Sequence, residues 1–198
     1  MILNFLAPTC ANCDRRSFKM LCADCQSEMK FQGCLGPSIE AAFWYRGGLV
    51  DWLRDIKEGR RPERLREILP FLPPAPQDLD VLVAAASDPT SRARRLFDTS
   101  DAFAQLLSKH WGIPLLKNFF ERRPFLSAQK NLKFGDRKSY LKKLVKISDR
   151  YKGVKLGRIL LVDDVYTTGA TIEVHQGLLK PLASEIRIFC LLRAPAIS

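Results

Sequence analysis

One stretch toward the C-terminal end of the chain joins an apolar run to carboxylates, hydroxyls and glycine. The run Ile159–Val162 predicts a buried strand, and two adjacent carboxylates, Asp163 and Asp164, follow it directly. Beyond them is a loop of small residues that leads into an expected helix: Thr167, Thr168, Gly169, Ala170 and Thr171. A helix N-terminus, backbone N–H groups and threonine hydroxyls bind phosphate, whereas paired carboxylates repel phosphate and accept hydrogen bonds from sugar hydroxyls. A plain strand-end turn with a helix cap explains one aspartate and one threonine, so the whole string predicts a site for a ribose 5-phosphate.

Four of the six cysteines form two pairs with the spacing of metal-binding knuckles. Two residues separate Cys10 from Cys13 and Cys22 from Cys25, and eight residues lie between the pairs. Two such turns bring four thiolates to one tetrahedral Zn²⁺, and four protein ligands make the site closed and structural. A redox dithiol stays open as the alternative, although it normally uses a single Cys-x-x-Cys pair. Cys190 lies in an apolar run and is expected in the core.

The rest of the sequence predicts the elements that position these residues. Residues 1–34 form the cysteine segment, which is too short to have a core without metal. Residues 35–77 are expected as a linker with two helices, and residues 78–198 as a domain in which apolar strands alternate with helices. The expected strands are 79–84, 113–116, 159–162 and 186–192, and the expected helices are 96–109 and 171–182. This order predicts an α/β fold with a parallel sheet flanked by helices.

Basic residues are concentrated in one part of the chain. There are 32 Lys and Arg residues against 21 Asp and Glu residues, a net charge of +11, which favours anionic partners. Residues 117–155 alone hold 13 basic and 3 acidic side chains. The same segment contains the aromatic residues Phe119, Phe120, Phe125, Phe134, Tyr140 and Tyr151. Basic groups on phosphates with rings stacked on bases would bind single-stranded DNA; a solvated basic face with the rings in the core is the alternative.

Composition and hydropathy exclude several classes of protein. With 46% hydrophobic and 27% charged residues, the chain has the profile of a globular protein, and not of a disordered, collagenous or coiled-coil one. No apolar run approaches the length of a membrane-spanning helix. Residues 1–6 lack the basic start of a signal peptide. The expectation is a cytoplasmic protein without membrane insertion.

The segment 158–171 resembles the phosphoribosyl-pyrophosphate motif of type I phosphoribosyltransferases. Together with the two cysteine pairs, it is similar to the ComF (ComFC-like) competence family, and the resemblance spans essentially the full length. Weaker similarity lies in residues 43–60 and in the spacing of Arg122, Gln129, Leu132 and Arg137. The resemblance implies a type I phosphoribosyltransferase-like fold with a structural zinc finger. It also implies a role in natural transformation, in which the protein handles incoming single-stranded DNA beside a helicase-like partner.

The resemblance also implies roles for single residues. Asp163 and Asp164 would hold the ribose hydroxyls of phosphoribosyl pyrophosphate. The residues from Thr167 to Thr171 would hold its 5-phosphate, and Mg²⁺ would arrive with the pyrophosphate. The chain departs from the family pattern on the pyrophosphate side. It has Ala84-Ala85-Ala86-Ser87 in place of a Pro-Val-Pro-like loop, residues 95–99 read Arg-Leu-Phe-Asp-Thr in place of Arg-Gly-Phe-Asn-Gln, and Tyr140 replaces a common asparagine.

Catalysis stays open at the level of the sequence. Phosphoribosyl transfer needs donors that stabilise the leaving pyrophosphate, and the candidate contacts to pyrophosphate or DNA are Arg92, Arg94, Arg95, Arg122, Arg123 and Lys130. No general base is identified, because His110 and His175 fall on expected helices, where a lone histidine is expected at the surface. A protein of DNA uptake whose phosphoribosyl-pyrophosphate (ribose 5-phosphate) site binds a nucleotide ligand or the DNA itself is the first hypothesis. A phosphoribosyltransferase that acts on a nucleobase or amine in salvage is the second.

Overall fold

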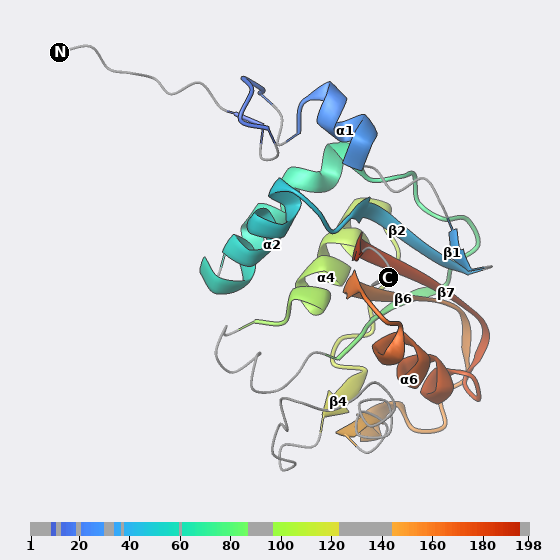
Figure 1. Cartoon of the computed structure of the whole chain (residues 1–198). Coiled ribbons are helices and arrows are strands. Elements are labelled where there is room, and N and C mark those ends of the chain that lie inside the picture. The colour runs from blue at the N-terminus through green and yellow to red at the C-terminus, as the bar shows by residue number, and fades with distance from the viewer. Residues whose placement is uncertain are drawn as a thin grey trace.

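A five-stranded sheet with helices on both faces forms the centre of the molecule (Figure 1). The computed structural model describes residues 9–10, 13–18, 21–29, 34–36, 38–59, 61–86, 97–122 and 144–194. The strand order is β1 (Cys34–Gly36), β2 (Ile39–Trp44), β7 (Ala183–Arg193), β6 (Leu156–Tyr166) and β3 (Val81–Ala84). Four of these strands are parallel, and β1 pairs antiparallel with β2. The predicted parallel-sheet α/β class is therefore confirmed.

The continuous apolar runs of β6 and β7 follow from burial on both faces of the sheet. Leu160 and Val162 pack into one hydrophobic cluster, and Ile159 and Leu161 pack into another, so alternate residues serve opposite faces. The register places Val162 beside Phe189 and Asp163 beside Cys190. Cys190 is fully buried, as predicted. Asp163 and Asp164 thus follow strand residues whose side chains are packed in the core on both faces of the sheet.

The helices divide between the two faces. On one side lie α2 (Gly48–Gly59), the 3-10 helix η1 (Pro62–Phe71) and α4 (Thr99–Trp111), whose buried residues share a cluster with the cysteine segment. On the other side α6 (Ala170–Leu179) packs with a two-stranded sheet of β4 (Phe120–Arg122) and β5 (Val145–Ile147). The remaining elements are α1 (Ala23–Met29) and the 3-10 helix η2 (Asp149–Tyr151). Among the described helices, none has both the length and the hydropathy that crossing a bilayer requires.

The structure corrects four sequence-based expectations. The segment predicted as a helical linker contributes strand β2, whose six residues carry too short an apolar run to be distinguished by pattern. The second helix predicted there is a 3-10 helix, and Pro70 inside it lacks the N–H that a regular α-helix uses. The predicted strand 113–116 is a single bridge between Leu82 and Leu115. His175, predicted at the surface, is fully buried.

Candidate functional site

The first carboxylate of the acid pair is enclosed by the protein. Asp163 is 7% exposed, and its Oδ1 accepts hydrogen bonds from the Ser100 hydroxyl at 2.8 Å and from the backbone N–H of Asp164 at 2.9 Å. Ser100 lies in the first turn of α4, which Asp98 caps by accepting from the N–H of Ser100. Burial, reinforced by the neighbouring Asp164 charge, raises the pKa of Asp163 to about 7. Asp163 therefore changes between its protonated and ionised forms near neutral pH.

The second carboxylate makes an ion pair with a distant part of the chain. Asp164 Oδ2 lies 2.7 Å from Lys57 Nζ, and the two side chains are only 16% and 20% exposed. Lys57 belongs to the last turn of α2, whose apolar face packs in the core through Ile56 and its neighbours. Sequence reasoning assigned no role in the site to Lys57 or Ser100. The helical spacing could show which face of α2 is buried, but not which element that face meets.

The loop after β6 turns sharply into α6. Gly169 has φ +81°, and a Cβ at this position would lie 2.6 Å from the Tyr166 hydroxyl, so only glycine fits without a shift. Arg193 fixes the loop, because its Nη1 donates to the Thr167 carbonyl at 2.8 Å and its guanidinium lies 4.7 Å from the centre of the Tyr166 ring. Thr167 and Thr168 are exposed. Glycine has no side chain to cap the helix, so the first N–H groups of α6 face the loop without a capping side chain.

The loop after β3 is the predicted pyrophosphate side, and a buried histidine ties it to α6. The Ala86 N–H donates to His175 Nε2 at 3.0 Å, and His175 Nδ1 donates to the Thr171 carbonyl at 2.6 Å. Burial lowers the pKa of His175 to about 4, so the ring is neutral, as these two bonds require. Arg122 donates to the Ala86 carbonyl from β4. The bond network explains why His175 is buried: a neutral imidazole supplies one donor and one acceptor to two backbone segments.

A pocket of about 480 Å³ lies beside this loop. Its walls are residues 84–86, Asp98, Asp101, Leu116 and residues 118–122. The rings of Phe119 and Phe120 are buried, which places these two aromatics in the core and not on a surface where bases could stack. Asp98, Asp101 and Glu121 give the pocket three carboxylates against the one guanidinium of Arg122.

The other basic candidates lie outside the described residues. These are Arg92, Arg94, Arg95, Arg123 and Lys130. Arg122 is described, and its bond to Ala86 places it at the β3 loop, where a pyrophosphate contact was predicted. Ser87 and Tyr140, where the chain departs from the family pattern, are also outside the described residues.

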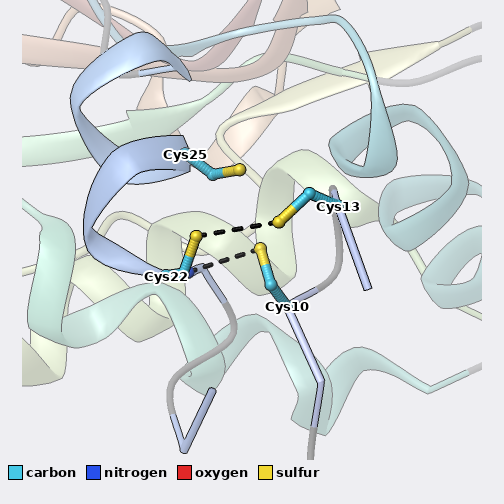
Figure 2. Close-up of side chains that lie close together, drawn as sticks. All are labelled: Cys10, Cys13, Cys22 and Cys25. Carbon is cyan, nitrogen blue, oxygen red and sulfur yellow. Dashed lines mark hydrogen bonds between the residues drawn. The ribbon is translucent and has the colours of Figure 1, made fainter. Parts of the chain in front are cut away.

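The four cysteines of the two pairs converge (Figure 2). Their sulfur atoms all lie within 4.8 Å of one another, and the distance from Cys13 Sγ to Cys22 Sγ is 3.7 Å, far longer than a disulfide bond. The N–H of Cys22 donates to Cys10 Sγ at 3.3 Å, and α1 begins directly after Cys22 and carries Cys25 in its first turn. Four cysteine sulfurs are the donor set of a structural Zn²⁺ site, so these residues fit the predicted metal.

Arg15 contributes a positive charge to this cluster. Its Nε donates to Cys13 Sγ at 3.3 Å and its Nη1 forms an ion pair with Asp24 at 2.8 Å. The hydrogen bond from Arg15 lowers the pKa of Cys13 to about 6. Because metals bind the thiolate, this contact favours the ligand form of the sulfur.

Comparison with known proteins supports the same resemblance. Competence protein F of Haemophilus influenzae is 34% identical over 102 residues, which are 51% of this chain and 44% of that protein. The chain thus matches less than half the length of this relative. The match confirms the resemblance to the ComF family. No protein-family model matches the chain.

Two phosphoribosyltransferases are among the solved structures that match part of the chain. A purine phosphoribosyltransferase from Pyrococcus horikoshii is 23% identical, with 72% of this chain and 83% of that one covered at a TM-score of 0.37. An adenine phosphoribosyltransferase from Leishmania tarentolae is 17% identical, with 70% and 74% covered at the same TM-score of 0.37.

Proposed function

We propose that this chain is a ComF-type protein of natural transformation with a binding site for phosphoribosyl pyrophosphate at the end of β6. One observation carries the ligand assignment: residues 163–170 combine two carboxylates near the end of β6, a glycine turn at Gly169 and the N-terminus of α6. The role in DNA uptake is supported by the similarity to competence protein F. The cytoplasm, where incoming single strands meet a helicase-like partner, is the proposed place of action.

The two halves of the segment suit the two ends of a ribose 5-phosphate. The ribose hydroxyls donate to Asp163 and Asp164, which accept because they are ionised when the ligand binds. The 5-phosphate accepts from the first N–H groups of α6 and from the exposed hydroxyls of Thr167 and Thr168. Mg²⁺ bound to the pyrophosphate would reduce the repulsion between ligand and carboxylates.

A titration with phosphoribosyl pyrophosphate and Mg²⁺, followed by thermal unfolding, tests the ligand. Binding to the native state raises the unfolding temperature in proportion to the logarithm of ligand concentration. We expect a rise for the wild type and none for Asp164→Asn, each compared with the same protein without ligand. Asp51→Asn, which removes an exposed carboxylate on α2, is the matched control and should respond like the wild type. A wild type that shows no rise at millimolar ligand contradicts the proposal.

The proposed contact with single-stranded DNA rests on charge. Residues 117–155 carry a net charge of +10, from 13 basic and 3 acidic side chains. The described lysines in this range that are exposed to solvent include Lys117, Lys152 and Lys155. Since Phe119 and Phe120 are buried, phosphate contacts and not stacking on these rings supply the affinity. Fluorescence anisotropy with an oligothymidylate at 50 and 200 mM salt should show affinity falling about tenfold or more. Binding that is absent at low salt, or equal at both salts, contradicts a DNA-handling role.

The pocket beside the β3 loop favours a second candidate, phosphoribosyl transfer to a nucleobase or amine. A pocket of about 480 Å³ has room for such an acceptor, and Asp98, Asp101 and Glu121 could accept hydrogen bonds from its N–H groups. In the reaction, an acceptor nitrogen forms a bond to C1 of the ribose, pyrophosphate leaves with the bonding electrons, and a proton departs from the nitrogen. Pyrophosphate release across a panel of bases and amines tests this candidate, and no release from any of them contradicts it.

A further inference from the structure

Lys57 is more than one hundred residues from the acid pair in sequence, yet its ammonium is a component of that site. The Nζ–Oδ2 distance to Asp164 is 2.7 Å, and the lysine side chain is 20% exposed. An ion pair on the open surface differs from it: the side chains of Lys152 and Asp149 are 71% and 68% exposed. An exposed pair of that kind contributes little and forms readily by chance. The enclosed pair of Lys57 has a fixed position.

The fixed position comes from the packing of α2. Leu49, Trp52, Leu53 and Ile56 are buried on one face of this helix. The indole Nε1 of Trp52 also donates to Glu67 Oε2 at 2.9 Å, which ties α2 to η1. Lys57 directly follows the fully buried Ile56, so the packing of the core fixes the position of the backbone from which the lysine side chain extends. The ammonium is therefore held beside the carboxylates.

The chemistry of a sugar diol explains why a site of carboxylates would include an ammonium. Each hydroxyl of a diol is both a hydrogen-bond donor and an acceptor, whereas ionised carboxylates only accept. Asp163 and Asp164 can therefore satisfy the hydroxyl hydrogens but not the oxygen lone pairs. The lysine ammonium has three N–H donors, and the bond to Asp164 uses one of them. The remaining donors suit the hydroxyl oxygens.

We propose that Lys57 is a sugar-binding residue and that, with Asp163 and Asp164, it makes this site select ribose over 2-deoxyribose. This inference rests on the proposed function of the same site. A ligand without the 2-hydroxyl leaves enclosed donors and acceptors unpaired, which is the situation in which polar sites discriminate most strongly. The DNA strand is consequently not the ligand of this site, because its sugars lack the 2-hydroxyl with which the three side chains would form hydrogen bonds. DNA binds on another surface, and the ribose site takes a small phosphoribosyl ligand.

Calorimetric titrations with ribose 5-phosphate and 2-deoxyribose 5-phosphate test the inference. We expect the wild type to prefer ribose 5-phosphate by about 10- to 100-fold, in line with the loss of charged hydrogen bonds. Lys57→Met should lose most of that preference, and Lys57→Arg, which keeps donors and charge, should retain part of it. Lys146→Met removes a lysine from an ion pair with Glu121 elsewhere and should keep the wild-type preference.

The outcomes separate this inference from the proposed function. A wild type that binds both sugars equally, or a Lys57→Met variant with an unchanged preference, overturns the role of Lys57 while leaving the phosphoribosyl site in place. A wild type that binds neither ribose 5-phosphate nor phosphoribosyl pyrophosphate overturns the proposed function itself. The wild-type preference is measurable even if Lys57→Met fails to fold, so the selectivity for ribose is tested in either case.

Discussion

The two candidate sites of this molecule are assembled in different ways. The cysteine cluster takes all its donors from residues 10–25, and a tight turn and the start of α1 bring them together. The site at the end of β6 instead combines residues from α2, α4, β6 and the start of α6. The first site depends on the spacing of residues within a short segment, whereas the second forms only when the sheet and its covering helices have come together. Substitutions in the two sites are therefore expected to have different consequences for the protein.

The sites also differ in how their charges are balanced. At the cysteine cluster, Arg15 donates to Cys13 and pairs with Asp24, and a metal ion would supply the positive charge that four converging thiolates need. In the acid pair, Asp164 is balanced by the Lys57 ammonium, and Asp163 accepts a hydrogen bond from Ser100. The cluster is accordingly expected to support folding, and the acid pair to support ligand binding on a fold that stands without the ligand.

Loss of the metal should have the largest effect. Protein purified without added metal is expected to contain one zinc per chain, and Cys10→Ser or chelation should lower the free energy of unfolding by several kcal/mol, on the order of a structural zinc site. Atomic absorption and denaturant unfolding measure both quantities. Cys34→Ser, outside the two pairs, should keep the metal. Metal-free protein with unchanged stability would contradict the structural-zinc interpretation and leave the redox dithiol.

Titration of His175 should have the next largest effect. Its native pKa is lowered to about 4 from 6.5, so the unfolded chain binds a proton first as the pH falls. The stability that the neutral ring provides is complete above pH 6.5 and is lost by up to about 1.4 kcal/mol per pH unit as the pH falls toward 4. Denaturant unfolding across this range should show a shallower fall for His175→Gln than for the wild type. His110→Gln, at an exposed histidine, should fall as the wild type does; identical slopes for all three proteins contradict the buried-ring account.

Substitution of Gly169 should lower both the stability of the protein and ligand affinity at the end of β6. Alanine must adopt the left-handed backbone there, at a cost of about 1–2 kcal/mol, and its Cβ must displace the Tyr166 hydroxyl. Gly112→Ala is the matched control, because φ is +71° and a Cβ there meets nothing within 4 Å. By thermal unfolding, Gly169→Ala should lose at least as much stability as Gly112→Ala, and only Gly169→Ala should lose affinity for phosphoribosyl pyrophosphate. Equal affinity in the two variants would show that the loop does not bind the phosphate.

The smallest expected effect concerns the protonation of Asp163. Because its native pKa is raised to about 7 from 3.8, this group favours the folded state most at low pH, and that contribution is lost as the pH rises through 7. Ligand hydroxyls bind the ionised form, so affinity for ribose 5-phosphate should rise by up to about tenfold per pH unit below 7. Asp163→Asn should remove this dependence in calorimetric titrations and leave only the titration of the ligand. A wild-type affinity that is the same from pH 6 to 8 contradicts the assignment.

The same contrast explains how much the sequence could predict. The cysteine ligands and the order strand, acid pair, glycine turn and helix were all predictable, because they depend on spacing within a short segment. Strands β6 and β7 were predictable from their continuous apolar runs, whereas β2 was hidden in a short mixed segment. Lys57 and Ser100 were not predictable, since their contacts with the acid pair depend on which helices cover the sheet. His175 was misplaced for the same reason: its partners Ala86 and Thr171 meet only in the folded chain.

A crystal structure of the protein with phosphoribosyl pyrophosphate and Mg²⁺ tests the central claim most directly. We expect the 5-phosphate at the N-terminus of α6, within hydrogen-bond distance of the loop from Thr167 to Thr171. We expect the ribose hydroxyls beside Asp163 and Asp164, with Lys57 in contact with one of them. A ligand bound elsewhere at saturating concentration, with this loop empty, would contradict the assignment of the β6 end as a phosphoribosyl site.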